Sequence, residues 1–205
     1  MNEQLKPHNQ ASAWFDDLYT EHKEQHENIP WARLEVNPLL KEYLQKTTQH
    51  QGKALVIGCG LGDDARAIEV AGYDVVAIDV SQKALELAQE RFPESDINFE
   101  KQDIFDMPDN YHEYFDFVFE AFTIQSLPVE FRETMIKAVA QTVAAKGKLL
   151  LVAHKREHMF NGPPWPLEEK ELSWFQNDLT QLYYEIHSEA SPLSNSRFNV
   201  LYQKI

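Results

Sequence analysis

Residues 54–62 read Ala54-Leu55-Val56-Ile57-Gly58-Cys59-Gly60-Leu61-Gly62, four apolar residues followed by a loop with three glycines in five positions. The apolar run predicts a buried strand, and the amphipathic residues 63–71 after the loop predict a helix. Glycine permits positive φ and lets a ligand approach the backbone, while the helix N-terminus offers free N–H groups to an anionic group. We therefore expect a ligand at this turn, with a tight turn that holds no ligand as the alternative.

The spacing of the glycines distinguishes between classes of ligand. A dinucleotide fingerprint requires glycine or alanine three residues after its second glycine, and Asp63 occupies that position here. The loop also lacks the Lys and Ser/Thr of a phosphate-binding loop. The pattern G-x-G-x-G therefore argues against a nicotinamide dinucleotide and against a phosphate loop.

The alternation of strands and helices continues along the chain. Further apolar runs lie at 74–78, 97–99, 115–119 and 148–153, and amphipathic segments at 81–91 and 130–144 lie between them. This order predicts an α/β fold, a doubly wound parallel sheet with helices on both faces. The last segments differ: the residues at 181–189 and 197–203 predict a closing antiparallel hairpin.

The N-terminal segment is predicted to form a helical cap on that core. Trp14 and Leu18 are four residues apart and give the first helix an apolar face. Pro38 then opens a second helix, since proline suits the first helical position. The chain is expected to be a single domain, with the cap at residues 1–50 and the cofactor-binding core at residues 51–205.

The composition limits the partners. The 205 residues carry a formal charge of −14, so the surface repels phosphate backbones and anionic membranes. No apolar run approaches the ~20 residues of a membrane span, and the N-terminal residues lack the form of a signal peptide. The one cysteine, Cys59, forms no internal disulfide. The histidine pairs His22/His26 and His154/His158, each four residues apart, lack an evident third metal ligand. We expect a cytoplasmic protein that binds a small molecule and no nucleic acid, membrane or metal; its oligomeric state stays open.

Two acids follow predicted strands at positions suited to a nucleoside. Asp79 ends the second strand, seventeen residues after Gly62, where a carboxylate can accept both hydroxyls of a ribose. Asp103 follows the third strand, where it can accept an adenine amino group with Ile104 against the ring. Each has a plainer alternative, Asp79 as the N-cap of the next helix and Asp103 as an exposed loop acid.

The glycine loop, the ribose acid and the adenine acid, in this order and spacing, resemble the class I S-adenosylmethionine-dependent methyltransferases over about residues 14–203. Most of that class has an acid two residues before the first glycine, where this chain has Val56. The branch of thiopurine, thiol and halide methyltransferases commonly lacks that acid. This branch is also similar at Ile29-Pro30-Trp31, at Gln125-Ser126-Leu127-Pro128 and at Gly162-Pro163-Pro164-Trp165-Pro166.

The resemblance implies a seven-stranded Rossmann-like sheet with an antiparallel last hairpin, and S-adenosylmethionine as the cofactor, converted to S-adenosylhomocysteine. It also implies a substrate loop near residues 157–170. The cofactor contacts that it implies by position are Trp31, Gly58, Cys59, Gly60, Gly62, Asp79, Val80, Asp103, Ile104 and Glu120.

Methyl transfer from a sulfonium is an in-line displacement on an activated carbon, so the protein has to orient the nucleophile and exclude water. Glu120 after the fourth strand and His154 after the fifth are the catalytic candidates, because either can orient an acceptor or take its proton. The alternative for His154 is a strand-end histidine that is hydrogen-bonded to the late loop. Aromatic side chains form a dry pocket and can face the sulfonium cation. The candidate acceptor-binding residues are Trp14, Phe15, Tyr19, Phe122, Phe160 and Trp165, with ordinary core packing as the alternative for Trp14 and Tyr19.

These features predict a methyltransferase whose acceptor is a small soft nucleophile, such as a thiol, a related chalcogen compound or a heterocycle. One alternative is methylation of an oxygen or nitrogen on a natural product. Another is a non-catalytic protein that binds S-adenosylmethionine without transferring its methyl group.

Overall fold

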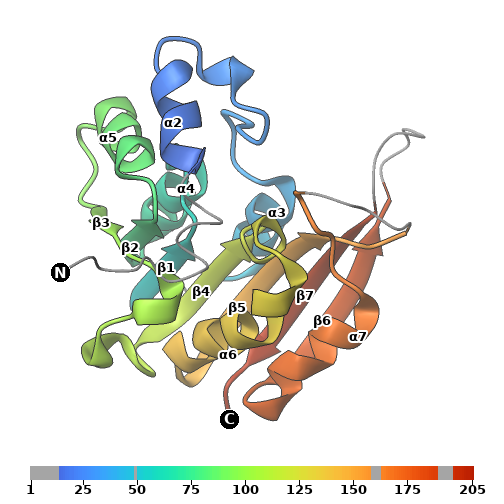
Figure 1. The fold of residues 1–205 in the computed structure, drawn as a ribbon. Coiled ribbons are helices and arrows are strands. Elements are labelled where there is room, and N and C mark those ends of the chain that lie inside the picture. The colour runs from blue at the N-terminus through green and yellow to red at the C-terminus, as the bar shows by residue number, and fades with distance from the viewer. Residues whose placement is uncertain (1–13, 49, 158–162, 189–195) are drawn as a thin grey trace, which may run out of the picture.

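The structure is a computed structural model that describes residues 14–48, 50–157, 163–188 and 196–205. Its centre is a seven-stranded sheet in the order β3-β2-β1-β4-β5-β7-β6 (Figure 1). Strands β1 to β5 run parallel, whereas β7 pairs antiparallel with both β5 and β6. This confirms the predicted mostly parallel sheet with an antiparallel C-terminal hairpin. The strands are β1 (Lys53–Ile57), β2 (Asp74–Asp79), β3 (Asn98–Lys101), β4 (Phe115–Ala121), β5 (Val143–His154), β6 (Thr180–His187) and β7 (Arg197–Gln203).

Helices pack on both faces of the sheet (Figure 1). The α-helices are α2 (Trp14–Glu21), α3 (Pro38–Lys46), α4 (Asp63–Ala71), α5 (Gln82–Arg91), α6 (Arg132–Thr142) and α7 (Glu169–Leu172). Strand β1 contributes to both apolar clusters, with Leu55 and Ile57 on the side of α6 and Ala54 and Val56 on the side of α3 and α4. Burial on both faces explains why this strand is apolar throughout. None of the helices in the described part of the chain is both long and apolar enough to cross a membrane.

Strand β5 differs most from its prediction. It begins at Val143 rather than near residue 148, and α6 accordingly ends at Thr142. The register with β4 shifts between Phe115 and Phe117, so the first part of β5 contains an irregularity. Lys146 within it has a φ of +64°. Polar residues and a bulge obscure the apolar pattern there, which is why the sequence predicts only the buried second half.

The predicted N-terminal cap divides into two parts. Helix α3 packs into the sheet core, where Leu40 is fully buried and Tyr43 stacks on Phe117. Helix α2 instead lies beside α5 (Figure 1). Its Tyr19 is packed in a separate small cluster with Leu61. The part of the N-terminal segment that lies over the carboxyl ends of the strands is therefore α2 with the loop that follows it.

Candidate functional site

The glycine loop between β1 and α4 adopts a backbone conformation that its glycines allow. Gly58, Gly60 and Gly62 have φ angles of +63°, +52° and +84°, a region that residues with side chains rarely occupy. A Cβ at Gly58 would collide with the side chain of Thr123, and one at Gly60 would lie 3.0 Å from the Tyr19 hydroxyl. Gly58 and Gly60 therefore lie between the turn after β4 and helix α2. Gly62, predicted as a cofactor contact, instead packs against Ala88 and Phe92 and does not line the cavity, which corrects that prediction.

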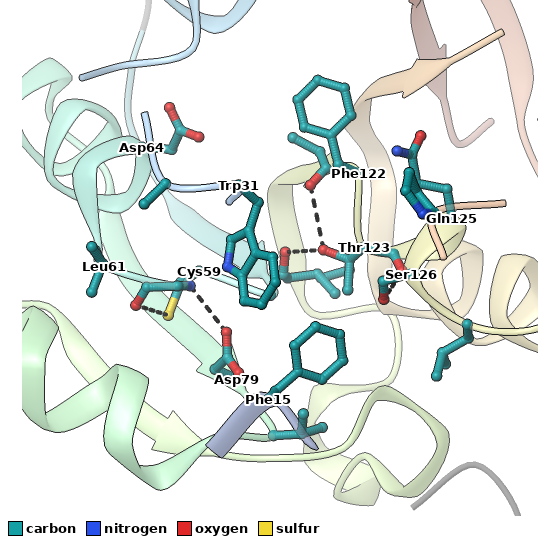
Figure 2. Close-up of a pocket in the computed structure, with 18 of the residues that line it drawn as sticks. Phe15, Trp31, Cys59, Leu61, Asp64, Asp79, Phe122, Thr123, Gln125 and Ser126 are labelled. Carbon is teal, nitrogen blue, oxygen red and sulfur yellow. Dashed lines mark hydrogen bonds between the residues drawn. The ribbon is translucent and has the colours of Figure 1, made fainter. Parts of the chain in front are cut away.

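A cavity of about 650 Å³ opens beside this loop. It lies at the carboxyl ends of the parallel strands, where open α/β sheets bind ligands, and its volume suits a small molecule or cofactor. Figure 2 shows Cys59 and Leu61 on one side of it, Phe122 and Thr123 on the other, and the ring of Trp31 between them.

Asp79 lies at the end of β2 and lines the cavity. Its Oδ2 accepts a hydrogen bond from Gly60 N at 3.0 Å (Figure 2), and its Oδ1 accepts one from Ser81 N at 2.9 Å. Burial raises the pKa of this carboxyl, and the backbone N–H groups partly oppose that effect. Ser81 fills the capping role considered for Asp79, because its side chain accepts from Ala84 N at the start of α5. Asp79 retains lone pairs that can accept ribose hydroxyls.

The two residues predicted to contact an adenine, Asp103 and Ile104, lie at the same end of the cavity as Asp79. Asp103 accepts a hydrogen bond from Phe105 N at 3.0 Å and begins a short 3-10 helix at Ile104. Both Asp103 and Ile104 line the cavity, as does the predicted contact Val80. A carboxylate beside an apolar side chain is an arrangement that can accept an amino group and pack against a ring.

Four aromatic residues of the cap form one cluster at the cavity. Trp31 Nε1 donates a hydrogen bond to Tyr19 Oη at 2.8 Å, and the Trp31 ring lies edge-on to Trp14, Phe15 and Tyr19 with centroids 5.4 to 5.8 Å away. All four residues line the cavity. Tyr19 is also packed core, at 3% exposure, whereas Trp31 is 39% exposed and keeps ring surface that a ligand can cover.

Phe122, His154 and Arg197 line a second end of the cavity. The ring centroids of Phe122 and His154 are 4.9 Å apart, and Arg197 Cζ lies 5.8 Å from the Phe122 centroid. His154 and Arg197 are register partners on β5 and β7, which places their side chains on one face of the sheet. This end presents an aromatic ring and two basic side chains, although the whole chain has a formal charge of −14.

Glu120 does not reach the cavity, which corrects its predicted contact with cofactor or acceptor. The side chain is 0% exposed, and its Oε1 accepts hydrogen bonds from the backbone N of Thr123 and of Ile124. Alternate residues of a strand point to opposite faces, and Glu120 shares the α6 side of β4 with Val118. Burial raises the pKa of Glu120 to about 7, partly opposed by these hydrogen bonds and by the charge of Arg132.

The predicted acceptor contacts in the loop near residues 157–170 are not found as expected in the described part of that loop. Trp165 is absent from the cavity wall; its backbone N donates to Gln125 O at 2.7 Å and its carbonyl accepts from Arg132 at 2.7 Å. Pro163 and Pro164, just before it, line the cavity instead. Phe160 lies outside the described residues.

The structure adds residues to the site that the sequence left unassigned. Asp64 in the first turn of α4 lines the cavity, and its Oδ1 accepts from Asn37 N at 2.7 Å. Burial raises the pKa of Asp64 to about 6. The position of Asp64 just after the glycine loop could have indicated a site residue. An acid in the first turn of a helix is also explained by its favourable interaction with the helix dipole, so the position alone does not assign it to the site. Arg197 had no local signal, because only strand pairing brings it beside His154.

Sequence comparisons relate the chain to methyltransferases. The profile of the thiopurine S-methyltransferase family matches residues 18–195. Thiocyanate methyltransferase 1 of Brassica oleracea is 29% identical over 140 residues, which are 66% of this chain and 61% of that protein. The match therefore spans about three fifths of that relative's length. Thiocyanate methyltransferase 1 of Arabidopsis thaliana is 27% identical over 163 residues, 78% of this chain and 70% of that protein.

Solved structures share the fold. Magnesium protoporphyrin IX methyltransferase from Synechocystis PCC 6803, solved with bound S-adenosylmethionine, has a TM-score of 0.72 at 17% identity, over 100% of both chains. The N-methyltransferase NodS from Bradyrhizobium japonicum WM9 has a TM-score of 0.71 at 20% identity, over 92% of this chain and 99% of its own. The neighbours establish the architecture only, whereas the family profile extends from helix α2 to the last hairpin; this protein belongs to the thiopurine S-methyltransferase family.

Proposed function

We infer that this chain is an S-adenosylmethionine-dependent methyltransferase and that its acceptor is a small soft nucleophile, a thiol, a related chalcogen compound or a heterocycle. The observation that carries this proposal is one continuous cavity with two chemically different ends. One end holds the glycine loop and Asp79, and the other holds Phe122, His154 and Arg197. Membership of the family and the thiocyanate methyltransferases among its relatives support the reaction class.

The residues at the first end fit S-adenosylmethionine. The carboxylate of Asp79 would accept the ribose hydroxyls, and Asp103 with Ile104 would hold the adenine. Asp64 lies across Trp31 from Asp79 (Figure 2), where its carboxylate would pair with the α-ammonium group of the methionine part. The bound cofactor supplies a methyl group on a positively charged sulfur.

The chain's own contribution is to orient the acceptor and exclude water. The aromatic cluster of the cap covers the cavity, and a desolvated site favours a reaction in which opposite charges cancel. Phe122 presents its ring at the acceptor end, where it can pack on the nucleophile and face the sulfonium. An acceptor that binds as a thiolate needs no base; for a neutral thiol, His154 is the cavity residue placed to take the proton.

The basic side chains at the second end favour an acceptor that is anionic when it reacts. Arg197 and His154 lie side by side there, so a thiolate or similar anion gains a charge-assisted contact. A neutral hydroxyl or amine on a natural product gains less from Arg197, because only one partner of that contact is charged. This observation ranks sulfur and related nucleophiles above oxygen and nitrogen.

The test uses methyl-labelled S-adenosylmethionine and a panel of hydrosulfide, thiocyanate, small thiols, a thiopurine, and matched alcohols and amines. We expect label in S-methylated products. Arg197→Gln should raise the KM of the acceptor about tenfold and leave the KM of the cofactor unchanged, because it removes a charged hydrogen-bond donor. Arg66→Gln, which lies outside the cavity wall, is the matched control.

Three other results would be decisive. Label confined to oxygen or nitrogen acceptors would contradict the proposed acceptor class. An Arg197→Gln variant with unchanged acceptor KM would remove Arg197 from acceptor binding. Binding of S-adenosylhomocysteine without transfer to any acceptor would favour a non-catalytic cofactor-binding protein.

A further inference from the structure

The carboxylate of Glu120 lies next to the turn that follows β4. Its Oε1 accepts two backbone hydrogen bonds, from Thr123 N at 2.7 Å and from Ile124 N at 2.9 Å. The side chain is 0% exposed, so it contacts no ligand in the cavity. An acid bonded in this way connects the end of the strand to the start of the 3-10 helix Ile124–Ser126.

This turn contains an uncommon backbone conformation. Phe122 has a φ of +65°, in a region that residues with a side chain seldom occupy. Its neighbours hold it there: Phe122 N donates to Val152 O at 2.9 Å, and Thr123 Oγ1 donates to Ile57 O at 3.1 Å (Figure 2). The two bonds to Glu120 fix the residues directly after Phe122. The same conformation places the Phe122 ring at the cavity beside His154.

One buried cation on α6 acts on Glu120 and partly opposes the effect of burial on its charge. Arg132 on α6 is 1% exposed, and its charge attracts the ionised Glu120. The Arg132 guanidinium is itself held, because Nη1 pairs with Glu171 Oε2 at 2.9 Å and Nη2 donates to Trp165 O at 2.7 Å. Among the described residues, Oε2 of Glu120 has no hydrogen-bond partner, so the bonding of this side chain is directed entirely at the turn.

We propose that Glu120 is a positioning residue for methyl transfer: it holds the turn after β4 in the conformation that presents the Phe122 ring to the acceptor, and it contacts neither reactant. The effect of Glu120 on methyl transfer rests on the proposed function, whereas its role in holding the turn after β4 does not. The proposal differs from an acid or base role, because a glutamine at this position accepts the same two hydrogen bonds but takes no proton.

The first experiment is independent of turnover. Amide hydrogen exchange is measured on wild type, Glu120→Gln and Glu120→Leu, each saturated with S-adenosylhomocysteine. We expect exchange at Thr123 and Ile124 to be at least tenfold faster in Glu120→Leu and near wild type in Glu120→Gln. Unchanged exchange in Glu120→Leu would overturn the proposal even if no acceptor were known, so its failure is distinguishable from failure of the proposed function.

The second experiment is kinetic and uses an acceptor found in the panel. Glu120→Leu should lower kcat/KM for the acceptor at least tenfold, with the KM of the cofactor within about twofold. Glu120→Gln should keep most of the activity. Phe122→Leu should cause a similar loss of kcat/KM. The double variant Glu120→Leu/Phe122→Leu should lose little more, because each substitution alone already removes the correctly placed Phe122 ring.

A variant that fails to fold does not block the test. If Glu120→Leu shows no cooperative thermal unfolding, Glu120→Gln decides alone. A folded Glu120→Gln with normal cofactor binding but activity reduced a hundredfold would assign proton transfer to Glu120 and overturn the positioning role. Near-normal activity and exchange in that variant would support it.

Discussion

The carboxylate of Asp79 both accepts a hydrogen bond from the glycine loop and lines the cavity. It accepts N–H groups from Gly60 and Ser81, so it fixes the glycine loop against the start of α5. The same side chain lines the cavity, although it is only 9% exposed. The backbone hydrogen bonds are what allow a carboxylate to remain this buried. Asp79 therefore connects the geometry of the glycine loop to the wall of the cavity.

Asp79→Asn should weaken S-adenosylhomocysteine binding about 10- to 100-fold, because it removes the charged acceptor that the proposed function assigns to the two ribose hydroxyls and replaces one loop acceptor with a donor. Isothermal titration calorimetry measures the change. Asp74→Asn, at the exposed start of the same strand, is the control and should bind normally. Equal affinity of Asp79→Asn and wild type would exclude Asp79 from the cofactor site.

Glu120 should leave a signature in the pH dependence of stability. Its pKa is raised from 4.5 to about 7 in the folded state, so between these values the unfolded chain is ionised there and the folded chain holds a proton. The free energy of unfolding of wild type relative to Glu120→Gln should therefore fall as pH rises through this window, by up to about 1.4 kcal/mol per pH unit, and level off above it. Urea unfolding at pH 5, 6, 7 and 8 tests this, and parallel curves for the two proteins would contradict it.

Among the elements, helix α2 is held over the cavity by contacts with α5. Asp16 Oδ1 accepts from Ser81 Oγ at 2.7 Å and from Lys83 N at 3.0 Å, so an acid of one helix caps the N-terminus of another. These hydrogen bonds lower the pKa of Asp16, because they stabilise its ionised form. The Trp31–Tyr19 hydrogen bond and the aromatic cluster complete the attachment.

Asp16→Ala should loosen α2 and weaken S-adenosylhomocysteine binding about fivefold, since a capping interaction contributes about 1 kcal/mol. The dissociation rate should account for most of the change, measured by stopped-flow displacement together with hydrogen exchange in residues 14–21. Asp17→Ala changes an adjacent exposed acid and should have no effect. Equal dissociation rates for the two variants would show that the Asp16 contacts do not hold the cap.

For the whole molecule, the cavity joins elements from the full length of the chain, from α2 to β7. A ligand that fills it should therefore stabilise the domain as a unit. At a concentration of 100 Kd, S-adenosylhomocysteine should contribute about 2.7 kcal/mol and raise the melting temperature by about 5–10 °C. NADH at the same concentration should cause no shift, because the loop has the wrong glycine spacing. A shift with NADH alone would reverse the choice of cofactor; differential scanning fluorimetry measures both.

Local sequence by itself determined the alternation of strands and helices, the glycine loop and the acids at the ends of β2 and β3. These features depend on short-range properties: hydrophobic period, the φ freedom of glycine and the fixed φ of proline. Asp79, Asp103, Ile104 and Trp31 are therefore predictable as ligand-site residues from the sequence, and all four line the cavity. The resemblance to a methyltransferase class rests on the same local pattern.

Tertiary structure alone decided which residues meet across the sheet. Arg197 lies beside His154 only because β7 is inserted between β5 and β6, a pairing that no local pattern encodes. Glu120 lies near the end of its strand, as Asp79 does, yet the pleat of β4 turns Glu120 into the core while Asp79 faces the cavity. The chain order of residues is linear, whereas strand order and side-chain direction arise from non-local packing. That physical difference separates Asp79, Asp103, Phe122 and His154, which were predicted from the sequence and line the cavity, from Arg197, which was not predicted.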